Sequence, residues 1–123
     1  MSAGIKHIEI AVSDLQRSLI FYDKLFEIIG WKKVPKNGYI SGDTKVYLKQ
    51  WDFPKGNKLG ARHICFWAND RAVVDKVGEY IKTTEVKIIR GPLIVQEYSP
   101  DYYTMDFYDP DGYMLEVAYT PEK

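Results

Sequence analysis

The chain has 123 residues, the length of one ordinary globular domain, which needs no disulfide or structural metal to fold. It carries 17 basic and 17 acidic side chains, so its formal charge is zero and no basic surface of the kind that binds nucleic acid is expected. No block of like charge suggests a membrane-surface patch, and no apolar run approaches the roughly 20 residues that cross a bilayer.

The cysteine and the first residues bear on the compartment. A single cysteine, Cys65, excludes an internal disulfide and suits a reducing environment. The residues after Met1 contain no long apolar stretch, and Glu9 follows early, so no secretory signal is expected. We therefore expect a cytoplasmic protein.

The chain repeats itself with a constant offset of 56 residues. Lys6-His7-Ile8 matches Arg62-His63-Ile64, and Asp14 matches Asp70 (63 − 7 and 70 − 14). An offset that spans about half of the chain indicates a duplicated unit.

The first copy begins with a predicted strand over residues 5–12, whose alternation puts His7, Glu9 and Ala11 opposite an apolar face. Ser13-Asp14-Leu15-Gln16 has the spacing of a capping box with Ser13 as the N-cap, and apolar residues at helical spacing continue to a stop at Gly30. Three short strands follow, over residues 31–35, 39–41 and 45–50, separated by turn dipeptides.

The second copy repeats this order. A strand over residues 61–68 puts His63, Cys65 and Trp67 on one face, and a helix starts at Asn69-Asp70. Strands are predicted over residues 86–90, 103–108 and 113–119, with a tight turn at Asp109-Pro110-Asp111-Gly112 before the last. The expectation is one α+β domain of two βαβββ modules: module one at 1–52, a linker at 53–60 and module two at 61–121.

Three polar residues point to metal chemistry. His7 and His63, the only histidines, occupy equivalent strand positions, and Glu116 lies on the same face of the last strand as Met114 and Ala118. Two imidazoles and a carboxylate are a ligand set for one divalent ion (Fe, Mn, Ni, Zn or Co), with positions left for substrate or water. A single strand histidine is more often a structural residue, and a scaffold that has lost its metal is the alternative.

Several other residues on the predicted cleft faces are candidates for the site. Glu9 is a base, a partner of a metal ligand or a solvated carboxylate, and Tyr47 is a catalytic candidate beside Lys49, which contacts substrate or is half-exposed. Cys65 is a pocket residue or a small buried apolar group. The remaining substrate-binding candidates, with aromatic packing as the alternative for the tyrosines, are Trp67, Tyr98, Tyr103 and Met114.

The openings His7-Ile8-Glu9-Ile10-Ala11-Val12 and His63-Ile64-Cys65-Phe66, with the ending Asp109-Pro110-Asp111-Gly112-Tyr113-Met114-Leu115-Glu116, resemble the vicinal oxygen chelate superfamily (glyoxalases, bleomycin resistance proteins and dioxygenases) over essentially the whole chain. The Tyr98–Tyr103 segment resembles an uncharacterised bacterial branch of that group. The resemblance implies paired βαβββ modules, a homodimer in many members, and His7, His63 and Glu116 as metal ligands.

The sequence departs from glyoxalase I at the fourth strand, where that enzyme has a glutamate ligand and this chain has Tyr47. Lactoylglutathione lyase and methylmalonyl-CoA epimerase activities are therefore doubtful. The expected function is a metal-dependent lyase, isomerase or ring-cleaving enzyme acting on a small substrate with vicinal oxygens. The alternative is a metal-free antibiotic-binding protein of the bleomycin-resistance type, and nothing favours a scaffold role.

Overall fold

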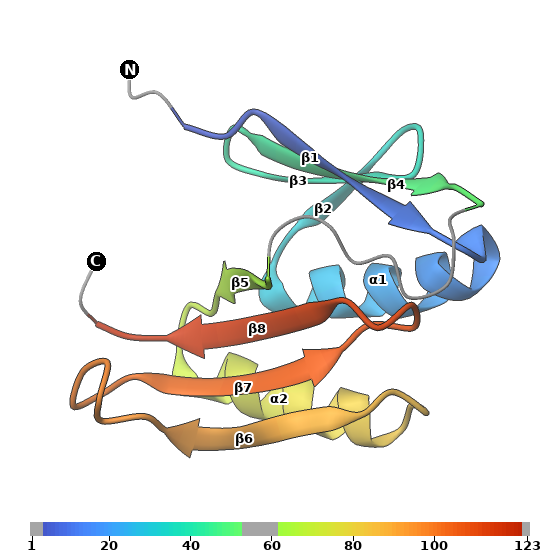
Figure 1. Cartoon of the computed structure of the whole chain (residues 1–123). Helices are drawn as coiled ribbons and strands as arrows, with labels where there is room; N and C mark the ends of the chain where they lie inside the picture. The colour runs from blue at the N-terminus through green and yellow to red at the C-terminus, as the bar shows by residue number, and fades with distance from the viewer. Residues whose placement is uncertain (1–3, 53–61, 122–123) are drawn as a thin grey trace. The chain divides into compact units, whose positions relative to one another are not determined.

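The computed structural model describes residues 4–52 and 62–121, and the predicted linker at 53–60 lies outside them. The chain divides into two compact units, Met1–Lys58 and Leu59–Lys123 (Figure 1). Each unit holds one four-stranded sheet and one helix in the order β-α-β-β-β, so the predicted α+β class and the pair of βαβββ modules are confirmed.

The first unit contains one helix and four strands: β1 (His7–Val12), α1 (Leu15–Ile29), β2 (Lys32–Val34), β3 (Gly38–Ser41) and β4 (Thr44–Gln50). Its sheet has the order β1-β4-β3-β2, in which only β1 and β4 run parallel. Exposure along β1 alternates as predicted: Ile10 and Val12 are buried, whereas His7 and Glu9 are exposed. The stacked rings of Phe26 and Tyr39, 4.3 Å apart, join α1 to β3 in the core.

The start of α1 corrects one prediction. Asp14, not Ser13, is the N-cap: its carboxylate accepts the backbone N–H of Arg17 at 3.1 Å. The Ser13 hydroxyl instead accepts from the Arg17 guanidinium at 3.0 Å. The end of the helix is as predicted, since Gly30 has a φ of 96° and its N–H bonds to carbonyl groups of the last turn.

The second unit contains β5 (Ile64–Trp67), α2 (Arg71–Lys82), β6 (Ile88–Ile94), β7 (Tyr103–Tyr108) and β8 (Met114–Tyr119), with the sheet order β5-β8-β7-β6. Asp70 caps α2 by accepting the N–H of Val73, which confirms the predicted start. The predicted turn also forms, with the Asp109 carboxylate accepting the N–H groups of Asp111 and Tyr113.

Strand β6 extends beyond its predicted end at residue 90. Gly91 lies inside it with a φ of 90°, and a Cβ there would meet the Thr104 carbonyl oxygen at 2.5 Å. The pairing with β7 shifts register on both sides of Arg90. The strand therefore continues through Gly91 with an irregular register, because glycine lets the two backbones approach.

One face of the second sheet is covered by α2, and we call the opposite face, which α2 does not cover, the open face (Figure 1). Tyr103 bonds to Asp75 on α2, so alternation places Met105 and Phe107 on the covered face, with their partners Val117 and Leu115 on β8. Thr104, Asp106, Glu116 and Ala118 therefore share the open face.

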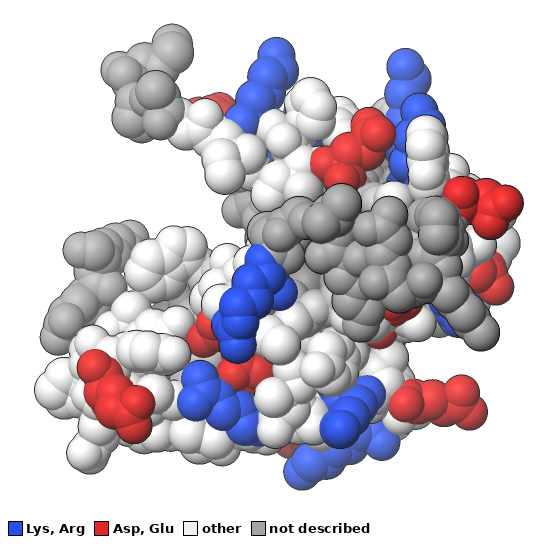
Figure 2. Space-filling view, viewed as in Figure 1, with Lys and Arg blue, Asp and Glu red and all other residues white. Residues whose placement is uncertain are grey.

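Among the residues that the structure describes, neither helix is long and apolar enough to cross a membrane. Basic and acidic side chains are interspersed on the face shown in Figure 2.

Candidate metal centre and ligand pocket

Glu116 is the centre of the polar cluster on the open face. Its residue surface is only 5% exposed, although it is a carboxylate in the middle of an apolar strand. The oxygen Oε2 accepts hydrogen bonds from the Tyr102 hydroxyl at 2.9 Å and the Thr104 hydroxyl at 2.7 Å. The other oxygen, Oε1, lies 3.2 Å from Nε2 of His63. One oxygen is thus anchored by two hydroxyl groups while the other faces an imidazole.

This pair has the spacing of two ligands on one ion. Two bonds of about 2.1 Å that meet near a right angle separate the donor atoms by about 3 Å. The observed 3.2 Å between Nε2 and Oε1 needs little adjustment to reach that value. The hydroxyl groups on Oε2 are partners of the kind that orient a ligating carboxylate. The residues present therefore fit a metal, as two ligands of a set.

A complete ligand set is not found within one unit. In residues 4–52 and 62–121 no group of three or more His, Cys, Asp or Glu side chains is arranged to hold an ion. His63 and Glu116 belong to the second unit, and His7 belongs to the first.

The contacts of His63 indicate its tautomer. The guanidinium of Arg62 lies 3.2 Å from Nδ1, and a guanidinium has only donors, so Nδ1 accepts. The proton of a neutral ring then resides on Nε2, the nitrogen that lies 3.2 Å from Oε1 of Glu116. A metal at Nε2 would need that proton to leave and the exposed Arg62 to move away from Nδ1.

The first sheet presents the other predicted residues. Glu9 pairs with Tyr47 and Ala11 with Lys49 in the parallel β1–β4 register. In the second unit Cys65, which corresponds to Glu9 by the offset of 56, pairs with Glu116. Tyr47 therefore occupies in the first sheet the position that Glu116 occupies in the second. A tyrosine thus stands in the first sheet where the second sheet has a carboxylate.

Tyr47 is held beside His7 by a glycine. A Cβ at Gly38, its partner across the strands, would lie 2.7 Å from the Tyr47 ring, so the ring rests directly over the glycine backbone. The rings of Tyr47 and His7 meet edge to face with centroids 5.9 Å apart. The sheet thus brings Tyr47 next to one predicted metal ligand.

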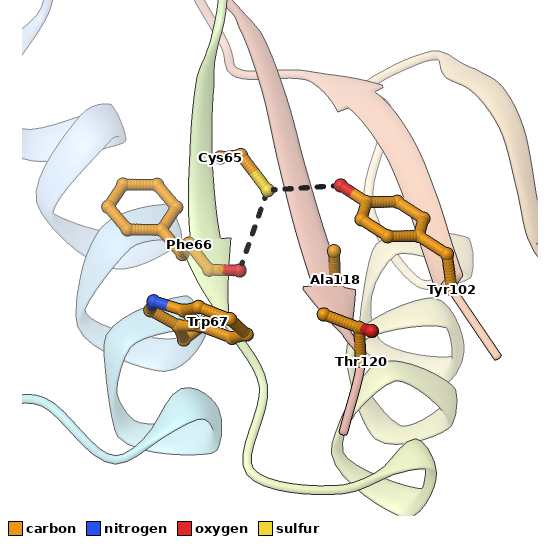
Figure 3. A pocket seen from close by; sticks show the side chains of 6 residues that line it. All are labelled: Cys65, Phe66, Trp67, Tyr102, Ala118 and Thr120. Atoms are coloured by element: carbon orange, nitrogen blue, oxygen red, sulfur yellow. Dashed lines mark hydrogen bonds between the residues drawn. The ribbon is translucent and has the colours of Figure 1, made fainter. Parts of the chain in front are cut away.

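A pocket of about 270 Å³ opens on the second sheet next to Glu116 (Figure 3). Its lining residues come from the strands β5 and β8 and the segments beside them: Cys65, Phe66, Trp67, Tyr102, Ala118 and Thr120. Tyr102 joins the pocket to the carboxylate, since its hydroxyl bonds to Glu116 and lies 3.9 Å from the Cys65 sulfur.

Both ionisable groups of the pocket are neutral near pH 7. Desolvation, followed by the negative charge of Glu116, raises the pKa of the Cys65 thiol to about 12. Desolvation also raises the pKa of Tyr102, together with its contacts to Cys65 and Glu116. Cys65 is therefore a thiol rather than a nucleophilic thiolate, and Tyr102 remains a hydrogen-bond donor.

Most predicted substrate residues of the second unit lie on the open face. Cys65 and Trp67 line the pocket, Tyr98 packs edge to face on Tyr102, and alternation puts Met114 on the face of Glu116. Tyr103 is the exception. Its hydroxyl bonds to Asp75 and its ring lies under Arg71, so its placement in the pocket wall is corrected.

Three residues of this face were not predicted as site residues. Tyr102 lies within the Tyr98–Tyr103 segment but was not predicted as a site residue, and no sequence signal marks Thr104, yet both anchor Glu116. Asp106 is buried opposite Glu116 on β7 and pairs with Arg90 at 2.6 Å. Alternation along β7 identifies the face of Thr104 and Asp106 once one residue of that strand is placed.

Comparison with known proteins assigns the family. The model of the Glyoxalase/Bleomycin resistance protein/Dioxygenase superfamily matches residues 4–117. A glyoxalase/bleomycin resistance protein from Albidiferax ferrireducens T118 is similar in structure at 21% identity, with a TM-score of 0.77, over 95% of this chain and 98% of that one. A glyoxalase/dioxygenase from Nostoc punctiforme has 24% identity and a TM-score of 0.72, over 97% and 92% of the two chains. These structures establish the shared fold, and the matched family model shows that the chain belongs to the Glyoxalase/Bleomycin resistance protein/Dioxygenase superfamily.

Proposed function

We propose that this protein is a divalent-metal-dependent enzyme that acts on a small substrate with vicinal oxygens. The observation that carries the proposal is the state of Glu116: a buried carboxylate with one oxygen anchored by Tyr102 and Thr104 and the other 3.2 Å from His63. His7 is the proposed third ligand, because it occupies in β1 the position that corresponds to His63. This assignment requires the two units to form one domain with a shared cleft.

The chain's own residues have distinct roles in this proposal. A divalent ion, when bound, would polarise a carbonyl or enediolate oxygen and acidify a bound water. Tyr102 keeps its proton and orients Glu116, whereas the exposed carboxylate of Glu9 is the candidate base and Tyr47 the candidate proton donor. Lys49, Trp67, Tyr98 and Met114 contact the substrate. The reaction is of the lyase, isomerase or ring-cleavage type.

The test is metal content and metal affinity. Protein purified without a histidine tag is expected to carry, or to take up on titration with Mn²⁺ or Ni²⁺, one ion per chain. His7→Ala, His63→Ala and Glu116→Gln should each weaken binding by at least about 100-fold, which exceeds the effect of losing an outer partner. Glu79→Gln, an exposed carboxylate on α2, is the matched control and should leave binding unchanged. No uptake, or full affinity in His7→Ala, contradicts the proposed site.

A second candidate is a metal-free binding protein of the bleomycin-resistance type. The contact of His63 with Arg62 favours it, because Nδ1 accepts from the guanidinium and the proton of a neutral ring then occupies Nε2, the nitrogen that a metal would need. This candidate predicts that ligand affinity is the same with and without EDTA. A ligand that loses affinity in EDTA contradicts it.

We also propose a homodimer located in the cytoplasm. The single cysteine, Cys65, is compatible with a reducing compartment, and many members of the family are dimers. Sedimentation at micromolar concentration should give a mass near twice 14.3 kDa. A single species at the mass of one chain would contradict the dimer.

A further inference from the structure

The pocket beside Glu116 has walls of unequal chemistry. Register places Ala118 of β8 between Trp67 on β5 and Thr104 on β7, so the smallest side chain lies on the middle strand. Trp67 rises on one side with 58% of its surface exposed, and Tyr102 stands on the other side (Figure 3). The result is a slot with a methyl floor and an aromatic ring on each flank.

The slot leads toward the carboxylate. The row of Trp67 and Ala118 is followed, two residues back along the strands, by the row of Cys65 and Glu116. Two residues of strand span roughly 6.6 Å, about the length of one six-membered ring with one substituent. A ring on Ala118 would thus present its substituent to the polar end, where the Cys65 thiol and the Tyr102 hydroxyl lie 3.9 Å apart.

The lining contains no charged side chain. None of its six residues is Lys, Arg, His, Asp or Glu. The nearest carboxylate, Glu116, is 5% exposed and its Oε2 accepts from Tyr102, so an anionic group at the polar end would face a negative charge. An exposed indole next to a methyl floor favours a flat apolar partner.

We propose that this slot binds an uncharged, planar single ring of the substrate, stacked on Trp67 with one oxygen at Tyr102 and Cys65. This inference rests on the proposed function for the purpose of the ring, and it adds the substrate class. Ring binding itself uses residues of the second unit alone. It should therefore occur in metal-free protein.

The test measures, by NMR on EDTA-treated protein, the binding of three probes that each have one six-membered ring with a methyl group opposite an oxygen-bearing group. The probes are p-cresol, which is planar and neutral, 4-methylcyclohexanol, which is neutral but not planar, and 4-methylbenzoate, which is planar and anionic. We expect p-cresol to shift the indole N–H resonance of Trp67, assigned by its loss in Trp67→Phe, with at least fivefold higher affinity than either other probe. Equal affinity for 4-methylcyclohexanol or 4-methylbenzoate overturns the proposal.

Variants separate stacking from folding. Trp67→Ala should weaken p-cresol binding about tenfold, whereas Trp67→Phe, which keeps a flat ring, should retain most of it. Trp51→Ala is the matched control: Trp51 is 59% exposed but lies after β4 in the first unit. Unchanged binding in Trp67→Ala, or an equal loss in Trp51→Ala, overturns the proposal.

The outcome is independent of the metal. If p-cresol binds as expected but no ion is taken up, the metal proposal fails and the slot stands. If an ion binds but p-cresol does not, the slot fails and the metal site stands.

Discussion

The hydrogen bond from Thr104 to Glu116 should contribute measurably to stability because both residues are buried. Thr104 is fully buried and its hydroxyl lies 2.7 Å from Oε2 of Glu116 and 3.1 Å from the Val117 carbonyl oxygen. A hydroxyl has one proton, so the shorter contact to the charged acceptor should take it. Thr104→Val keeps the shape and removes the donor. The expected loss is about 1.5–3 kcal/mol, the range for a bond to a charged group.

A double-mutant cycle isolates this interaction. With Glu116→Gln the acceptor is neutral, and the same bond is expected to contribute only about 0.5–1.5 kcal/mol. Thr104→Val should therefore cost about 1 kcal/mol less in the Gln background than in the wild type. Urea unfolding of the four proteins, with equal slopes, gives the four free energies of unfolding.

A threonine of the first unit provides the control. The Thr44 hydroxyl donates to the Ile5 carbonyl at 2.9 Å and shares no partner with Glu116. Thr44→Val and Glu116→Gln should be additive within about 0.5 kcal/mol. If Thr104→Val costs the same in both backgrounds, the Thr104 proton goes to Val117 and Glu116 lacks this anchor.

Three further predictions concern other parts of the chain. Gly91→Ala should destabilise the protein by at least about 3 kcal/mol in thermal unfolding, because φ at Gly91 is positive and the new Cβ would meet the Thr104 carbonyl oxygen. A loss below about 1 kcal/mol would show that β6 and β7 move apart at little cost. Desolvation and the hydrogen bond to Asp23 raise the pKa of Tyr39 above 10.0, so the stability that its hydroxyl contributes is full below pH 10 and declines above it. The difference in free energy of unfolding between the wild type and Tyr39→Phe should therefore shrink by up to about 1.4 kcal/mol per pH unit. A constant difference from pH 9 to 11 would contradict this. Because its pKa is about 12, Cys65 should react with iodoacetamide at pH 8 on the order of 50-fold more slowly than a free cysteine, after allowance for its higher nucleophilicity. A rate equal to that of free cysteine would refute the raised pKa of this thiol.

Local patterns in the sequence predicted the elements because they depend on neighbours in the chain. The offset of 56 predicted two modules, and period-two alternation placed Cys65, Trp67 and Glu116 on one face of the second sheet. The exceptions are also local. Ser13 and Asp14 are both good N-cap residues, and the extended backbone conformation that an N-cap needs occurs at Asp14. The strand predicted to end at residue 90 continues to Ile94, and Gly91 allows this because it lets the backbone approach Thr104 closely.

The partners of Glu116 depend on pairing between strands distant in sequence. Tyr102 and Thr104 are 14 and 12 residues away, and the β7–β8 register alone brings their hydroxyl groups to one carboxylate oxygen. Tyr103, adjacent to both, turns to α2 because successive side chains of a strand point to opposite faces. The sequence by itself thus determined the duplicated modules and the face of each candidate ligand, which follow from local periodicity. The tertiary structure decided which hydroxyl groups hold Glu116 and which tyrosine reaches the pocket, because strand register sets those contacts.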